Sequence, residues 1–229
     1  MIELAKRIRT HGLLGISQSV LSVIEDYLFD AEYGFDTRTE VAVDDLDIDQ
    51  EDKLQAEKYK PTRARYFRQL LRRIHIPRHG TFVDVGCGKG RVLMLAAEHG
   101  FDRVVGLEIS ANLCDLAQNN IERFRRRYHN APPINVVCGN VLDYSFQDVE
   151  TVFFLYSPFE RDLTRQFLDK VRASLERNPR QLFIVINEFH FPELLENEPL
   201  LSHVFSFKYG AAAFDVYESQ AVHSYNPPN

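Results

Sequence analysis

A glycine-rich turn between a predicted strand and a predicted helix is the feature that most constrains this chain. It lies in FVDVGCGKGRVLMLAAE, residues 82–98, and places glycines at the alternate positions Gly86, Gly88 and Gly90. Glycine is favoured where a backbone turns sharply or approaches a ligand closely. Ligands of open parallel sheets lie beyond the carboxyl ends of the strands. We therefore expect this turn to border a ligand crevice.

Predicted strands and helices alternate along the chain. The predicted strands are residues 81–86, 103–108, 134–138, 151–156 and 181–186, with a closing hairpin at 204–207 and 214–219. The predicted helices are residues 63–75, 91–99, 111–128 and 161–177. This order predicts an α/β fold, a doubly wound and mostly parallel seven-stranded sheet of the Rossmann-like kind, with a C-terminal antiparallel hairpin.

The chain divides into a predicted N-terminal helical extension, residues 1–58, and a main domain, residues 59–229. In the extension, apolar side chains recur at helical spacing, at Val20, Leu21, Ile24 and Leu28. This pattern predicts an amphipathic helix over residues 17–28 that packs on the domain.

The charge distribution disfavours one class of partner. The 229 residues carry a formal net charge of −6, which is unlike a protein that binds nucleic acid mainly through its charge. Acidic residues are concentrated between 44 and 52, and arginines lie on the outer side of helix 63–75 and at 123–127. These clusters predict solvated surfaces.

The cysteines and the hydropathy pattern indicate the cellular compartment of the protein. Three cysteines, Cys87, Cys114 and Cys138, form no CxxC pair. An odd number without that spacing predicts neither a disulfide framework nor a zinc site, and is typical of the reducing cytoplasm. No segment reaches the roughly 20 apolar residues that a membrane span needs. We expect a cytoplasmic protein without a metal or a membrane span.

Three nucleotide-type ligands compete for the glycine turn. A phosphate-binding P-loop needs G-x-x-x-x-G-K-[ST], which is absent. A dinucleotide fingerprint needs G-x-G-x-x-G, but here the third glycine comes one residue early and Arg91 takes its place. That spacing disfavours an NAD-dependent oxidoreductase. The remaining ligand is S-adenosylmethionine (SAM), which carries an amino acid group, a ribose diol and an adenine but no phosphate.

Polar residues at later strand ends match the groups of SAM. Glu108 ends the second predicted strand, where a carboxylate can accept both ribose hydroxyl protons. Asp84 precedes the first glycine by two residues and suits a cationic amino group. Asn140 follows the third strand and can reach an adenine amino group. Tyr156 ends the fourth strand, at the edge where a methyl acceptor should lie.

With these features the chain resembles the class I SAM-dependent methyltransferases. The resemblance rests on the D-x-G-x-G-x-G loop at 84–90, the acid Glu108, the G-[DN] turn at Asn140 and the x-P-F turn at 157–159. It covers residues 60–190. Two departures stand out: Asn140 replaces a usual Asp, and Ser157 replaces a frequent Asn. Ser157 lacks the carboxamide that amino-methylating enzymes of the family use, so a nucleic-acid base is disfavoured as the acceptor.

The chain also resembles a narrower bacterial subfamily, which has a GxDT segment and a YxPT segment before the core. Here these are residues 34–37 and 59–62. The resemblance implies that Tyr59 and Thr62 close over the cofactor, and we expect residues 34–62 to form a lid. The predicted cofactor-binding residues are Tyr59, Thr62, Asp84, Gly86, Cys87, Gly88, Gly90, Glu108, Ile109, Asn140, Val141 and Tyr156.

The predicted function is transfer of a methyl group from SAM to an unidentified acceptor, with a protein side chain or a small molecule favoured. The catalytic candidates are Tyr156, Ser157 and His190, although a structural role is the simpler interpretation of His190. The alternative is a SAM-binding module that regulates or scaffolds without catalysis.

Overall fold

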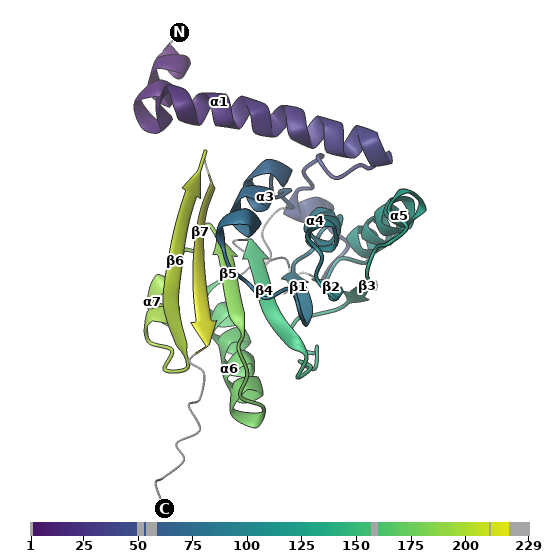
Figure 1. Ribbon diagram of the computed structural model, residues 1–229, viewed down its shortest axis with the longest axis vertical. Helices are drawn as coiled ribbons and strands as arrows, with labels where there is room; N and C mark the ends of the chain where they lie inside the picture. The colour runs from purple at the N-terminus through teal and green to yellow at the C-terminus, as the bar shows by residue number, and fades with distance from the viewer. Residues whose placement is uncertain (1, 50–52, 54–58, 157–159, 211, 220–229) are drawn as a thin grey trace, which may run out of the picture.

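The computed structural model (Figure 1) describes residues 2–49, 53, 59–156, 160–210 and 212–219, with the backbone alone for residues 2–16. Its centre is a seven-stranded sheet in the order β3-β2-β1-β4-β5-β7-β6. The strands are β1 Thr81–Val85, β2 Arg103–Glu108, β3 Ile134–Cys138, β4 Glu150–Tyr156, β5 Phe183–Asn187, β6 Leu201–Tyr209 and β7 Ala212–Ser219. The first five are parallel, and β7 runs antiparallel between β5 and β6. The predicted fold class is confirmed.

Helices cover both faces of the sheet, as a doubly wound fold requires. On one face lie α3 Ala64–Arg73, α4 Arg91–His99 and α5 Ala111–Arg127; on the other lie α6 Arg161–Arg177 and α7 Pro192–Glu196. Successive strand residues alternate between the two cores, because side chains of a strand point to opposite faces. In β4, Phe154 packs toward α3 and Phe153 packs toward α6. Burial on both faces explains why the parallel strands are almost entirely apolar.

The N-terminal helix α1, Ile2–Tyr33, is much longer than the predicted 17–28. It lies across α3 and reaches α5 (Figure 1). The predicted packing of this helix is wrong in its orientation. Its apolar residues Val20, Leu21, Ile24 and Leu28 are exposed, Leu28 by 64%. The buried polar side chains are Ser22, Asp26 and Asp30.

Ion pairs explain why the acidic side of α1 faces the domain. Glu25 pairs with Arg65 at 3.2 Å and with Arg68 at 2.9 Å, and Asp26 pairs with Arg63 at 2.9 Å. The arginine side of α3, predicted to be solvated, is therefore partly covered by α1. None of the described helices combines the length and the hydrophobicity that crossing a bilayer requires.

Candidate functional site

The glycine turn follows β1 and leads into α4. All three glycines adopt left-handed backbone conformations, with φ of +77° at Gly86, +52° at Gly88 and +83° at Gly90. Residues with a Cβ rarely adopt such conformations. The amides of Gly86 and Cys87 donate to the carbonyl of Leu107 in β2. A Cβ placed on Gly86 would meet no atom within 4 Å. The turn is thus fixed by β2 and leaves open space at Gly86.

Glu108 ends β2 beside this turn, as predicted. Its Oε2 atom accepts a hydrogen bond from the Gly88 amide at 2.8 Å, and its Oε1 atom accepts one from the Ser110 amide at 3.0 Å. Burial raises the pKa of Glu108, while these amide hydrogen bonds act in the opposite direction. A carboxylate has about four lone-pair sites. Acceptor capacity therefore remains for further hydroxyl donors.

Asp84 lies in β1, one residue before the strand ends. Its side chain is 3% exposed, and burial together with the nearby Glu108 raises its pKa well above the usual range. No hydrogen bond from the described part of the chain reaches its carboxylate. A buried carboxylate in this state is suited to a ligand cation, because a positive charge favours the ionised form.

The third strand end comes close to the second. The Gly139 amide donates to the Glu108 carbonyl at 2.9 Å, so the turn after β3 lies next to the end of β2. In that turn, Asn140 Oδ1 accepts a hydrogen bond of 2.9 Å from the Leu142 amide. Val141 is buried, and Ile109 is half-buried. The ends of β1, β2 and β3 therefore lie next to one another at one edge of the sheet.

Tyr59 lies directly on the glycine turn. A Cβ on Gly88 would come within 2.1 Å of Tyr59 Cε2, so the tyrosine ring occupies the space that this glycine leaves. Tyr59 Oη donates to the Thr37 carbonyl at 2.8 Å, and Tyr59 forms a β-bridge with Val41. The GxDT and YxPT segments are thus joined to each other over the turn.

One further contact holds the GxDT segment in place, and another holds the YxPT segment. Lys89, within the turn, pairs with Asp36 at 3.1 Å. Burial acts to raise the pKa of Asp36, but hydrogen bonds from Thr39 and Lys89 lower it overall. Thr62 is buried, and its carbonyl accepts a hydrogen bond of 3.3 Å from Arg91.

Arg91 anchors the extension to the start of α4, a role that the sequence analysis missed. It is 2% exposed, lies 3.2 Å from Asp26 and 3.6 Å from Asp30 of α1, and donates to Thr37 Oγ1 at 2.8 Å. The sequence signal was present, since Arg91 interrupts the dinucleotide fingerprint. These three partners lie more than 50 residues away in sequence, so no local pattern indicated them.

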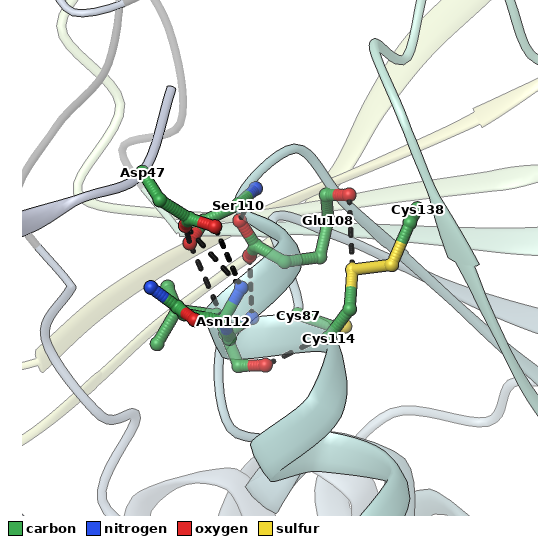
Figure 2. The surroundings of a disulfide bond; sticks show 9 residues. Asp47, Cys87, Glu108, Ser110, Asn112, Cys114 and Cys138 are labelled. Atoms are coloured by element: carbon green, nitrogen blue, oxygen red, sulfur yellow. Dashed lines mark hydrogen bonds between the residues drawn. A yellow bond between two sulfur atoms is a disulfide. The ribbon is translucent and has the colours of Figure 1, made fainter.

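Asp47 corrects the prediction that residues 44–52 are only a solvated acidic loop. Its carboxylate accepts hydrogen bonds from Ser110 Oγ at 2.5 Å and from the Asn112 amide at 3.1 Å (Figure 2). The hydrogen bond from Ser110 lowers the pKa of Asp47. The acceptor sits at the first turn of α5, where free amides and the helix dipole favour an anion. The extension therefore contacts the residues that directly follow Glu108.

A disulfide joins Cys114 of α5 to Cys138 at the end of β3 (Figure 2), so the prediction of no disulfide is wrong. The two Cα atoms are 6.1 Å apart, although 24 residues separate them in sequence. Packing of α5 against β3 produces this proximity, which spacing alone does not reveal. Cys87 is a free and buried thiol, and burial raises its pKa well above the usual value, which makes it a poor nucleophile.

The predicted acceptor edge is formed by the ends of β4 and β5. Tyr156 Oη donates to Glu188 Oε1 at 3.4 Å. Burial and the nearby Glu188 raise the pKa of Tyr156, so its hydroxyl keeps its proton at neutral pH. Ser157, with the rest of the x-P-F turn, lies outside the described residues, and His190 is exposed. The described side chains contain no cluster suited to a metal ion.

Comparison with known proteins finds one matching family and several structures with a similar fold. Residues 82–178 match the family described as "Methyltransferase domain". The fold is similar to an RNA methyltransferase from Salinibacter ruber in complex with S-adenosyl-L-homocysteine, with a TM-score of 0.53 and 18% identity over 69% of this chain and 93% of that chain. It is similar to a SAM dependent methyltransferase from Aquifex aeolicus, with a TM-score of 0.51 and 14% identity over 66% and 88% of the two chains. No curated protein matches the chain.

Proposed function

We propose that this chain transfers a methyl group from SAM to an acceptor at the ends of β4 and β5, because residues 82–178 match the methyltransferase domain family and the fold is similar to that of a methyltransferase in complex with S-adenosyl-L-homocysteine. The observation that carries this proposal is the convergence of Asp84, Glu108 and Asn140 around one glycine turn. The protein-side-chain or small-molecule acceptor remains the favoured class. The family match favours catalysis over a SAM-binding module that only regulates or scaffolds.

The residues at the ends of β1, β2 and β3 have distinct tasks toward SAM in this proposal. The ribose hydroxyls would donate to the remaining lone pairs of Glu108, and the cationic amino group would lie near Asp84. The adenine would lie between Ile109 and Val141, with Asn140 at its amino group. SAM supplies an already activated methyl group, so this chain's residues mainly hold and align the reactants, which can lower a barrier by roughly 7–11 kcal/mol.

The residues present fit this cofactor. A turn with open space at Gly86, a buried carboxylate without a hydrogen-bond donor at Asp84, and spare acceptor capacity at Glu108 complement a ligand with a cation and a diol.

Glu108→Ala tests this placement. It removes the ribose acceptor and should weaken SAM binding by about 1.5–3 kcal/mol, as for hydrogen bonds to charged groups. Isothermal titration with SAM measures the change. Glu122→Ala, on the exposed side of α5, is the matched control and should bind like the parent. If Glu108→Ala bound SAM as tightly as the parent, the ribose would lie elsewhere.

Catalysis is tested with radiolabelled SAM and fractionated lysate. Transfer of label to the protein fraction or to the small-molecule fraction, but not to the nucleic-acid fraction, is the expected result. Label found only on nucleic acid would overturn the favoured acceptor class. SAM binding with no transfer to any fraction would support the non-catalytic alternative.

We also propose that residues 34–62 act as a lid over SAM. The contacts of Tyr59 with Gly88, of Lys89 with Asp36 and of Asp47 with Ser110 support this, because all three join the segment to the crevice edge. Such a lid excludes water and completes an active site. Hydrogen exchange should slow across residues 34–62 when SAM is added. Unchanged exchange, together with undiminished SAM affinity after deletion of residues 1–58, would remove the support for a lid.

A further inference from the structure

The ends of β4 and β5 bring polar side chains together on one face of the sheet. Tyr156 and Asn187 are register partners on these two neighbouring strands. Both side chains share the face covered by α3, because Phe154 and Val185, two residues earlier, pack in that core. Glu188 follows Asn187 and accepts the hydrogen bond from Tyr156.

Two unusual features coincide at this strand end. Asn187 is 3% exposed, and its Oδ1 atom accepts no hydrogen bond from the described part of the chain. Buried polar atoms without a partner are rare and costly. Glu188 adopts a φ of +56°, a left-handed conformation that a residue with a Cβ seldom adopts. Unpaired atoms and strained backbones of this kind are concentrated at functional sites.

The polar atoms of this cluster are suited to a ligand rich in hydrogen-bond donors. The Tyr156 hydroxyl donates its hydrogen bond to Glu188, so the lone pairs of Oη can accept hydrogen bonds from a ligand. Asn187 Oδ1 and the carboxylate of Glu188 are acceptors as well. An alkylammonium group has three N–H donors and no acceptor. An alcohol has one donor, and an ionised carboxylate or phosphate has none. None of these three groups can donate to all the acceptors of the cluster.

The charges around Tyr156 also favour a cationic ligand. Burial is the main cause of its raised pKa, Glu188 and Glu40 add to it, and Arg63 opposes it. Arg63 is paired with Asp26 at 2.9 Å, which offsets its positive charge. Two carboxylates thus act on this region, and the aromatic ring of Tyr156 offers a face that attracts cations. The site favours a cation over a neutral or anionic group.

We infer that this cluster is the acceptor site and that it takes a primary alkylamine, delivered as an ammonium group by a lysine side chain or by a small molecule. The inference rests on the proposed methyl transfer. Glu188 accepts one proton from the ammonium group, which frees the nitrogen lone pair. That lone pair forms the new N–C bond as the methyl–sulfur bond breaks, and the electron pair of the broken bond stays on the sulfur of S-adenosylhomocysteine. The products are an N-methylammonium group and a protonated Glu188.

A binding experiment on the full chain tests the site without knowledge of the natural acceptor. The protein, saturated with S-adenosylhomocysteine, is titrated with n-butylammonium, n-butanol and butyrate at pH 7.5 and followed by NMR. Butylammonium should shift the signals of Tyr156 and its neighbours, whereas butanol and butyrate should not. Equal binding of butanol or butyrate would overturn the amine assignment.

Variants connect the binding to the named atoms. Glu188→Gln should lower butylammonium affinity at least about tenfold, as expected for a lost hydrogen bond to a charged group. Asn187→Leu, an apolar side chain of similar size, should lower it as well. Glu176→Gln, on the exposed side of α6, is the control and should leave it unchanged. Undiminished affinity in both site variants, with native thermal melts, would overturn the inference.

A second measurement distinguishes a lysine side chain from a small molecule as the source of the amine. It also distinguishes failure of the acceptor site from failure of the proposed function. Methyl transfer from labelled SAM is compared between a lysine-containing peptide and butylamine, and the better acceptor identifies the source. If S-adenosylhomocysteine binds but ammonium does not, only the acceptor site is wrong. If ammonium binds but SAM does not, the proposed function fails and the amine site stands on its own.

Discussion

At the scale of single residues, Asp84 shows how a side chain can be placed for a ligand at a cost to the fold. Its carboxylate is buried near a second carboxylate, Glu108, and no hydrogen bond from the described residues reaches it. Ionisation is therefore less favourable in the folded chain than in the unfolded chain. Such a group reduces stability unless a cation binds beside it.

Asp84→Asn should therefore stabilise the ligand-free protein and weaken SAM binding. The pKa of Asp84 is raised on folding, so the unfolded chain ionises first as pH rises above the ordinary value of 3.8. Above that pH the folded state binds more protons, and the free energy of unfolding of the parent falls with rising pH. The variant lacks this pH-dependent fall. Its free energy of unfolding, measured in urea, should therefore exceed that of the parent by an amount that grows from pH 4 toward neutral pH.

The same variant should lose about 1.5–3 kcal/mol of SAM affinity by titration, because the amino group loses a charged partner. Asp115→Asn, on the exposed side of α5, should change neither quantity. A variant that was less stable than the parent at pH 7 would contradict the assigned burial cost.

The glycines of the turn give a second prediction, based on one difference between them. Gly86 and Gly88 both have left-handed backbones, but only Gly88 faces a side chain, that of Tyr59. Gly86→Ala should cost about 1–2 kcal/mol of unfolding free energy from the backbone alone. Gly88→Ala should cost about 1–3 kcal/mol more, because its Cβ overlaps the tyrosine ring.

That excess should disappear when Gly88→Ala is combined with Tyr59→Ala, as a double-mutant cycle in urea would measure. Equal losses for the two glycine variants, in either background, would mean that Tyr59 does not rest on the turn.

At the scale of elements, α1 is held by ion pairs together with one buried apolar residue, Phe29. Its apolar residues Val20, Leu21, Ile24 and Leu28 face outward, and its acidic side chains contact arginines of α3 and α4. Arg91 is the central partner, because it is buried and reaches Asp26, Asp30 and Thr37 at once. The helix that precedes the GxDT segment is thereby connected to the helix that follows the glycine turn.

Asp26→Ala should destabilise the protein by about 3–5 kcal/mol, because it removes the nearest carboxylate from the buried Arg91 guanidinium. Arg63→Ala removes the half-exposed partner of the same aspartate and should cost only about 0–1 kcal/mol. Urea unfolding of the two variants measures the difference. Similar costs for both would show that the pairing with Arg91 is not what holds α1.

At the scale of the whole molecule, the disulfide connects two layers of the fold. Cys114 belongs to a helix and Cys138 to the edge strand that this helix covers, and Cys114 Sγ lies 3.4 Å from the carbonyl of Glu108. The bond closes a loop of 24 residues that contains the rest of α5 and all of β3.

Reduction of this bond should lower the free energy of unfolding by about 3 kcal/mol, the loss expected for a loop of this length. Cys138→Ser should show the same loss without a reducing agent and no further loss with one. Thermal melts with and without dithiothreitol provide the comparison. A parent protein whose melting is insensitive to dithiothreitol, with reduction verified by thiol titration, would contradict the expected contribution.

The sequence by itself determined the sheet, most of its helices and the positions of Asp84, Glu108 and Asn140 at strand ends. β2, β3, α4 and α6 begin and end where their patterns predicted, because periodicity and glycine placement are local signals that neighbouring residues express together. The order of strands then placed those residues at one edge of the sheet.

Only the tertiary structure decided which distant groups meet. The outward apolar side of α1, the partners of Arg91, the contact of Asp47 with Ser110, and the pairing of Cys114 with Cys138 all join segments far apart in sequence. A helical pattern shows that a helix has two sides, but the charges on the opposing helices decide which side is buried. In α1 the arginines of α3 and α4 determine which side is buried. An unpaired buried cation costs more free energy than an exposed apolar side chain, so the acidic side of α1 faces the arginines.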